Sequence, residues 1–210
     1  MKVVVFGSTG GTGREIVRQA LELGHEVTAF ARHAETLRFA HERLRVVEGD
    51  ALRWASVDAA IKGQDAVLSA LGTRSLFKPI TLLSQSTEYI VGSVKRLHVR
   101  RLIVESSLGV GDSQGQLGLI GTWIGVGVFL ARIYADKERQ ERIIAGSQLD
   151  WTIVRPAMLT NGPKRGNYRT WSGAAPKPTA SRISRADVAH FMLSILGMTE
   201  TYHRAINCSY

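Results

Sequence analysis

The sequence predicts an α/β fold: a doubly wound parallel sheet with helices on both faces and a small irregular substrate lobe. Short apolar runs rich in Val and Ile alternate with helical patterns along the chain, as expected of buried parallel strands joined by crossover helices. The chain has 210 residues and is 44% hydrophobic and 21% charged, which suits one globular unit. No repeat or linker divides it, so we expect a single domain over residues 1–210.

Six apolar runs are predicted as strands because they are short, mostly unbroken and rich in β-branched residues. They are Lys2–Phe6, Glu26–Ala31, Leu44–Glu48, Ala66–Ala70, Arg101–Ser106 and Trp151–Arg155. A short final strand is expected within Ala205–Cys208.

Helical patterns fill the intervals between these strands. They are Thr12–Leu23, a weak one at Ala34–Phe39, Ala55–Ile61, Leu82–Leu97 and Val128–Ala145. Gly24 stands where a glycine commonly ends a helix. The motif SRAD, residues 184–187, is a capping box that opens a last helix, which we expect to stop at Gly197.

Two segments, Leu108–Gly127 and Met158–Arg182, break this alternation. Each follows a predicted strand, so each should overhang the carboxyl edge of the sheet, where ligands of open α/β sheets bind. We therefore expect the substrate lobe to be built from residues 108–127 and 158–182.

The stretch VVVFGSTGGTGREIV, Val3 to Val17, places three glycines between a strand and a helix. Gly7 permits a tight turn, Gly10 admits phosphate oxygens to the backbone, and Gly13 lets the helix pack closely on the sheet. Amides at a helix N-terminus suit a diphosphate, and nearby hydroxyls can add donors. The predicted dinucleotide-binding residues here are Gly7, Ser8, Thr9, Gly10, Gly11, Thr12 and Gly13.

The end of the second strand indicates which dinucleotide is bound. An NAD site places a carboxylate there for the ribose 2′-hydroxyl, whereas this chain has Arg32 and His33, with Arg38 nearby. A guanidinium pairs with a 2′-phosphate through two donors, so NADP(H) is predicted. The alternative is that Arg32 is merely exposed, and Glu35 lies close to it in the sequence.

Two further stretches are expected to border the cofactor. Asp50, Ala51 and Leu52 follow the third strand and could contact the adenine, although Asp50 could instead cap its own loop. Small residues at the end of the fourth strand would let the middle of the cofactor cross the sheet edge. The residues assigned to the cofactor there are Ala70, Leu71 and Gly72.

Composition narrows the classes of partner and compartment. The net charge is +9, but no aromatic-interleaved basic stripe occurs, so nucleic-acid binding is not expected. The single cysteine, Cys208, and the absence of a signal-peptide pattern favour a cytoplasmic protein.

The six histidines lack metal-ligand spacing, so no metal is expected. The uncharged stretch 113–131 is short and glycine-broken for a membrane span; it could be a lid, core, or a homo-oligomer contact through 117–131.

Six stretches in family order carry a resemblance to a known group. They are VVVFGSTGGTGREIV, GHEVTAFAR, VVEGDAL, GQDAVLSALGTR, DWTIVRPAMLT and ISRADVAHFML. The chain resembles the atypical short-chain dehydrogenase/reductases of the NmrA-like, NAD(P)H-binding kind, and most closely their flavin- and biliverdin-reducing members. The resemblance implies a Rossmann fold, NADP(H), and hydride transfer to a flat conjugated small-molecule acceptor such as a flavin, a bilin or a quinone.

The same resemblance implies candidate catalytic residues. Ser107 matches the serine beside the nicotinamide, and its neighbour Ser106 is assigned to the cofactor. The Tyr-x-x-x-Lys pair of classical members is absent, but Tyr134 and Lys137 stand three apart on one predicted helix. Tyr134 is a candidate proton donor and Lys137 a candidate ligand of the nicotinamide ribose. Met158 stands where the flavin-reducing relatives have a histidine.

Two other functions stay open. One is an NmrA-like redox sensor that binds NADP(H) without turnover and reports to a partner. The other is a nucleotide-sugar epimerase or dehydratase, against which the missing Tyr-x-x-x-Lys and the short C-terminal portion argue.

Overall fold

A sheet lies at the centre of the fold in the computed structural model, which describes residues 1–37, 40–72, 81–113, 127–173 and 182–210. Within these residues the main sheet has eight strands in the order β3-β2-β1-β4-β5-β6-β10-β8. All neighbouring pairs are parallel except β10 and β8. The strands are β1 Lys2–Phe6, β2 Glu26–Ala31, β3 Leu44–Glu48, β4 Ala66–Ser69, β5 Arg101–Glu105, β6 Asp150–Pro156, β8 Arg169–Trp171 and β10 Arg204–Ser209. The predicted doubly wound α/β fold is confirmed.

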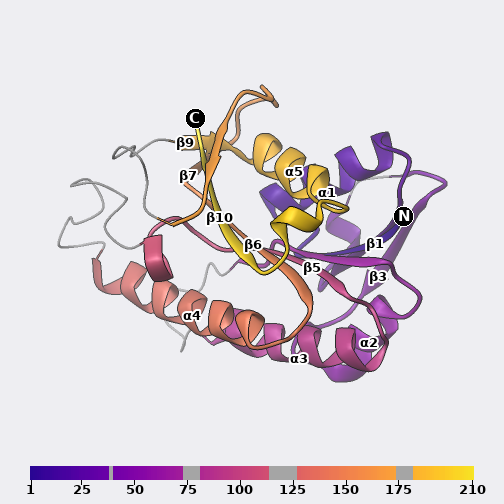
Figure 1. The fold of residues 1–210 in the computed structure, drawn as a ribbon. Helices are drawn as coiled ribbons and strands as arrows, with labels where there is room; N and C mark the ends of the chain where they lie inside the picture. Colours follow the sequence, from indigo (N-terminus) through magenta and orange to yellow (C-terminus); the bar gives the residue numbers. More distant parts are fainter. Residues whose placement is uncertain (38–39, 73–80, 114–126, 174–181) are drawn as a thin grey trace.

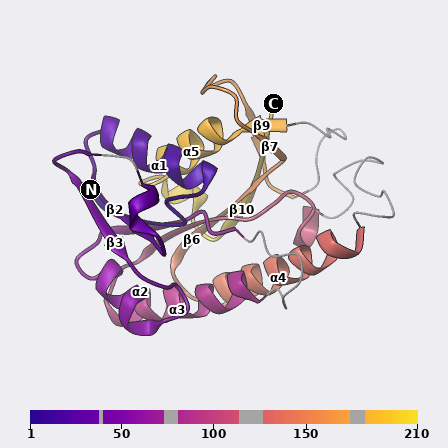
Figure 2. The ribbon, with the colours of Figure 1, turned by 180° about the vertical axis from the view of Figure 1, so that it is seen from behind.

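Helices cover both faces of this sheet (Figures 1 and 2). On one face lie α1 (Gly11–Glu22) and α5 (Arg185–Ser194); on the other lie α2 (Trp54–Ile61), α3 (Leu82–Arg96) and α4 (Gly127–Ala145). Successive side chains of a strand point to opposite faces. Val3 and Val5 of β1 therefore belong to the core under α1 and α5, while Val4 and Phe6 belong to the second core under the other helices.

The predicted strands and helices agree with the structure to within one or two residues at most ends. Gly24 has a φ of +83° and ends α1 as expected. The weak helix predicted at Ala34–Phe39 is a single 3-10 turn, η1, at Ala34–Thr36, and its last two residues lie outside the described part. The last helix ends at Ser194 rather than at Gly197, because a tighter turn follows in which the Met198 amide donates to the Ile195 carbonyl.

The segment 158–182 is less irregular than the sequence predicted. It contains β7 (Met158–Thr160) and β8 and leads into β9 (Arg182–Ser184). β7 pairs with β9 in a separate two-stranded sheet, and β8 adds an antiparallel edge to β10. Strands of three residues are too short to show an alternating pattern, and their partners are distant in the sequence.

The predicted segment 108–127 is described only in part. A 3-10 turn, η2, covers Gly111–Ser113, and α4 begins at Gly127. Most of the proposed lid and oligomer contact at 117–131 lies outside the described residues.

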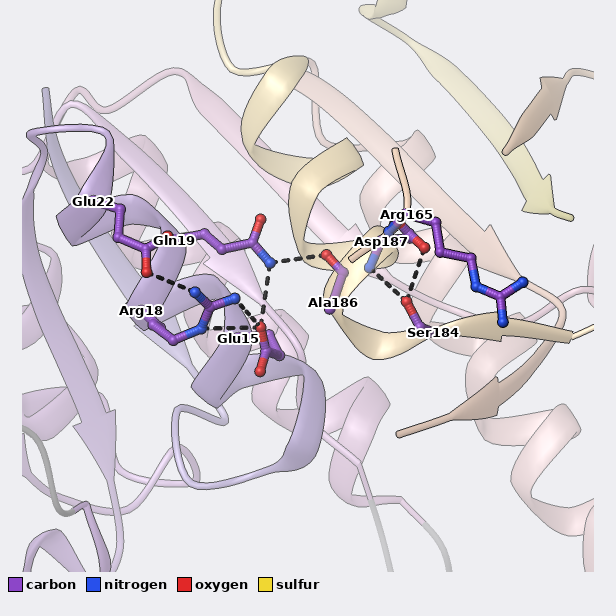
Figure 3. Close-up of polar contacts among 8 residues, drawn as sticks. All are labelled: Glu15, Arg18, Gln19, Glu22, Arg165, Ser184, Ala186 and Asp187. Atoms are coloured by element: carbon purple, nitrogen blue, oxygen red, sulfur yellow. Dashed lines mark hydrogen bonds and ion pairs between the residues drawn. The ribbon is translucent and has the colours of Figure 1, made fainter. Parts of the chain in front are cut away.

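Helices α1 and α5 are joined by polar contacts that Figure 3 shows. The Gln19 side-chain amide donates to the Ala186 carbonyl at 2.8 Å. Ser184 caps α5 and accepts a hydrogen bond from the Asp187 amide at 3.0 Å, which confirms the N-cap. The reciprocal bond of a capping box is replaced, because the Ser184 amide donates to the Tyr210 hydroxyl at 3.1 Å. This junction brings the start of α5, near the C-terminus, against the first helix of the chain.

Candidate functional site: a dinucleotide-binding edge

In the glycine turn between β1 and α1, neighbouring backbone atoms lie too close to two of the glycines for a side chain to fit. Gly7 has a φ of +78°, and a Cβ there would lie 2.5 Å from the Ala70 carbonyl oxygen. A Cβ on Gly13 would lie 2.1 Å from the Gly7 carbonyl oxygen. The Gly10 amide donates to that same carbonyl at 2.9 Å and closes the turn. Only glycine fits at both positions, so the start of α1 is held directly against the strand ends.

Three of the predicted cofactor hydroxyls are directed to protein acceptors instead. Ser8 donates to the Phe30 carbonyl at 2.9 Å and Thr12 donates to Glu105 Oε1 at 3.0 Å. Ser106 donates to Glu141 Oε1 at 2.5 Å and is buried. Burial obliges each of these hydroxyls to find a partner inside the protein, and the assignment of the three residues to the cofactor stays a prediction.

The turn still fits a diphosphate through its main chain. The amides in the first turn of a helix have no intrahelical acceptor, and in α1 these belong to Gly11, Thr12 and Gly13. They carry the partial positive charge that attracts an anion. Thr9 is partly exposed beside them. The cradle left by the absent Cβ atoms therefore matches the dinucleotide that the sequence predicted.

A surface pocket of about 450 Å³ lies where the adenosine half was expected. Its lining residues are Arg32, His33, Glu48, Gly49, Asp50, Arg53 and Ser56. Asp50 faces this pocket and also accepts a hydrogen bond from the Leu52 amide at 3.0 Å, so both of its proposed roles fit. Ala51 is buried in the adjoining core. Arg38 lies outside the described residues.

The residues predicted beside the middle of the cofactor border the glycine turn. Ala70 directly follows β4, and its amide donates to the Phe6 carbonyl at 2.9 Å. Leu71 is partly buried and Gly72 is exposed. The end of β4 is thus adjacent to the end of β1, and the contact of these residues with the cofactor stays a prediction.

The structure brings Ser107 and Tyr134 together. Their hydroxyl oxygens are 3.4 Å apart, and the Tyr134 hydroxyl also donates to the Leu108 carbonyl at 3.1 Å. Tyr134 lines a pocket of about 210 Å³ between the loop after β5 and α4. The other lining residues are Gly109, Val110, Gly111, Ala131, Ala135 and Glu138. This pocket is the candidate position for an acceptor.

Glu105 is a site residue that the sequence analysis missed. Its side chain is buried at the end of β5, directly before the two serines. Burial raises its pKa, while the positive charges of Lys137 and Arg185 and the hydrogen bond from Thr12 oppose that rise. A charged residue directly after the apolar run Leu102–Val104 was the available signal.

Lys137 faces this buried carboxylate and is itself partly buried. Burial lowers the pKa of its ammonium group, and the negative charges of Glu105, Glu141 and Asp136 oppose that change. Lys137 therefore lies in the middle of α4, close to the carboxylate that ends β5. Its assignment to the nicotinamide ribose stays a prediction.

An ion-pair network fixes α4 on the strand ends. Arg155 of β6 donates to both carboxylate oxygens of Glu141, at 3.0 and 2.6 Å, and also pairs with Asp112. Because Glu141 also accepts from Ser106, one buried carboxylate links β5, β6 and α4. This network holds Tyr134 and Lys137 in place relative to Ser107.

Comparison with known proteins places this geometry in a family. A family model described as NAD(P)H-binding matches residues 7–199. The chain belongs to this NAD(P)H-binding family. That membership confirms the predicted nicotinamide dinucleotide cofactor. The chain is also 32% identical over 175 residues to an uncharacterized chloroplastic protein of Arabidopsis thaliana, covering 79% of this chain and 62% of that protein. It thus spans about three fifths of the length of that relative.

Solved structures of family-like proteins have the same fold. ChuY, an anaerobillin reductase from Escherichia coli O157:H7, superposes with a TM-score of 0.83 at 22% identity, over 100% of this chain and 97% of that chain. A short-chain dehydrogenase/reductase of Veillonella parvula in complex with NADP gives a TM-score of 0.80 at 21% identity, over 100% and 94% of the two chains. Over the part of the chain that the structure describes, no helix has both the length and the apolar character to cross a membrane.

Proposed function

We propose that this NAD(P)H-binding protein is an NADPH-dependent reductase that transfers hydride to a flat conjugated acceptor: a flavin, a bilin or a quinone. The observation that carries the proposal is the pair of hydroxyls on Ser107 and Tyr134, 3.4 Å apart beside the pocket of about 210 Å³. This pair follows the carboxyl end of β5, on the same edge of the sheet as the glycine turn after β1. A ligand crossing that edge would meet both.

A preference for NADPH over NADH rests on the second pocket. Arg32, His33 and Arg53 contribute its basic groups, and Arg32 is exposed at the end of β2. From this exposed position the Arg32 guanidinium could form a bidentate contact with a 2′-phosphate. The two carboxylates of the pocket are each engaged, Asp50 by the Leu52 amide and Glu48 by the Ala34 amide at 3.2 Å.

Bound NADPH would supply the hydride itself. Ser107 would hold the nicotinamide carboxamide or the acceptor by its hydroxyl, and Lys137 would contact the nicotinamide ribose. Tyr134 keeps Ser107 oriented and borders the acceptor. Flavins, bilins and quinones can take a proton from solvent after reduction, so the site needs no dedicated acid. The likeness in fold to an anaerobillin reductase supports an acceptor of this flat, conjugated class.

The test is to mix the purified protein with NADPH or NADH and follow cofactor oxidation against FMN, biliverdin and simple quinones. We expect oxidation of NADPH with at least one acceptor and much slower use of NADH. Tight NADPH binding without turnover of any acceptor would instead favour a redox sensor. Equal use of the two cofactors would contradict the role given to Arg32.

A further inference from the structure

The side chain of Arg185 lies across the first turn of α1, at the glycine turn. A Cβ added to Gly11 would lie 2.5 Å from Arg185 Cδ and 2.7 Å from its Nε. Gly11 is the first residue of α1 and is exposed, whereas Arg185 is the first residue of α5 and is half-buried. The absence of a side chain at Gly11 therefore makes room for an arginine from the far end of the chain.

Packing between the two helices fixes where this arginine begins. The residues on either side of Arg185 are both anchored: Ser184 caps α5, and the Ala186 carbonyl accepts from Gln19 of α1 (Figure 3). At its far end the guanidinium donates to Asn161 Oδ1 at 2.6 Å. Arg185 is thus held at both ends over the turn, rather than extending freely into solvent.

The charges around Arg185 favour an anion. The first turn of α1 contains no acidic residue, so the positive charge of Arg185 adds to the partial positive charge of the helix N-terminus. The carboxylate on which its charge acts, Glu105, is buried beneath the turn and is shared with Lys137 and Thr12. Lys137 also lies near Glu141 and Asp136, whereas Arg185 and the N-terminus of α1 have only a share of the charge of Glu105, so an approaching diphosphate would add negative charge beside them.

We propose that Arg185 is a diphosphate-binding residue of the NAD(P)H site. Its side chain lies beside Gly11, in the first turn of α1, so its guanidinium and the main-chain amides of that turn would contact the diphosphate together. Asn161 orients the guanidinium and links the end of β7 to the cofactor. This inference deepens the cofactor site, and it does not depend on which acceptor is reduced.

The experiment measures binding of NADPH and of NADH by fluorescence titration of wild type, Arg185→Gln and Arg185→Lys. The diphosphate is common to both cofactors, so Arg185→Gln should weaken both by the same factor, about tenfold to a hundredfold for a charge-assisted contact. The NADPH-to-NADH affinity ratio should stay unchanged. Arg185→Lys keeps the charge but loses the planar fork, so its affinities should be intermediate. Because binding is measured without an acceptor, failure of the proposed reductase activity would not alter the result.

The matched control is Lys164→Gln, which removes one positive charge from an exposed residue of the loop that follows Asn161; it should leave both affinities within about twofold. Unchanged affinities in Arg185→Gln overturn the proposal, and so does a loss confined to NADPH, which would assign Arg185 to the 2′-phosphate. Circular dichroism and melting temperature establish that each variant is folded. If Arg185→Gln does not fold, the affinities of Arg185→Lys test the proposal. Several-fold weaker binding of both cofactors by Arg185→Lys supports the proposal, and binding as tight as that of the wild type overturns it.

Discussion

The hydroxyl oxygens of Ser107 and Tyr134 lie 3.4 Å apart, although the residues are 27 positions apart in the sequence. Ser107 follows β5, Tyr134 belongs to α4, and the Leu108 carbonyl accepts a hydrogen bond from the tyrosine. The tyrosine hydroxyl thus contacts both the serine and the loop that carries it, and we expect the pair to act as a unit. Two substitutions can separate their contributions.

Ser107→Ala should lower turnover more than it weakens NADPH binding. Removing one hydrogen bond to a reacting group costs about 1–1.5 kcal/mol, or roughly tenfold in rate. NADPH affinity should change by about twofold or less, because most cofactor contacts lie elsewhere. Steady-state rates with FMN or biliverdin and a separate binding titration provide the two numbers. Unchanged turnover would reject the role assigned to Ser107.

Tyr134→Phe should reduce turnover by a smaller factor, and the double variant should be non-additive. The Ser107 and Tyr134 hydroxyls are in contact, so we expect a coupling energy of about 0.5–1 kcal/mol in a double-mutant cycle. The measurement is kcat/KM for the wild type, both single variants and the double variant. Strict additivity would show that the two hydroxyls act independently.

Arg32→Ala should weaken NADPH binding by about tenfold to a hundredfold while leaving NADH binding nearly unchanged, because a 2′-phosphate occurs only in NADPH. Titration of both cofactors at low and high salt checks the result, since a phosphate contact at an exposed site weakens with ionic strength. This pattern differs from that expected for Arg185→Gln, which affects both cofactors alike. An equal effect on the two cofactors would remove Arg32 from the 2′-phosphate site.

Gly13→Ala and Gly11→Ala form a contrasting pair. The Cβ at residue 13 would lie 2.1 Å from a backbone carbonyl, which cannot move without shifting β1 or α1. We expect loss of cofactor binding and a drop in stability of about 3 kcal/mol or more. The Cβ at residue 11 meets only the side chain of Arg185, which can rotate away. Gly11→Ala should therefore stay folded, as thermal melting would show, and bind cofactor less well.

Asp187 should make the stability of the fold depend on pH. Burial alone would raise the pKa of its carboxyl, but hydrogen bonds from Tyr210, Ser184 and the amides of Arg165 and Gly166 outweigh that effect and lower the pKa below its usual value. The folded state thus binds the proton less tightly than the unfolded state. The stabilisation is present above the ordinary pKa of 3.8 and is lost as pH falls through the lower folded value.

Asp187→Asn should accordingly cost about 2–4 kcal/mol near pH 7 and less near pH 3. Urea melts at the two values of pH measure the difference. Asp65→Asn is the control, because that exposed carboxylate accepts one backbone hydrogen bond, from the Lys2 amide at 2.7 Å. A destabilisation by Asp187→Asn that is equal at both values of pH would contradict the assignment.

The sequence by itself determined the order of the strands and helices, the glycine turn and the class of cofactor. These features are local. A buried parallel strand appears in the sequence as a short apolar run, and the turn after the first strand needs a residue with a left-handed φ, which is Gly7. The position of Arg32 could be located in the same way, because the alternation of strands and helices along the sequence shows where the second strand ends. The three-residue strands β7, β8 and β9 could not be identified, because they contain no repeat long enough to show a period.

Only the tertiary structure decided which polar groups bond inside the protein. Ser8, Thr12 and Ser106 are suitable donors by residue type, yet their partners Phe30, Glu105 and Glu141 lie 22, 93 and 35 positions away. The same long-range packing brings Arg185 onto Gly11 and Lys137 toward Glu105. A buried donor needs an acceptor close to it in space. Which acceptor is close depends on the order of the strands in the sheet and on the packing of the helices, and a local sequence pattern does not show either.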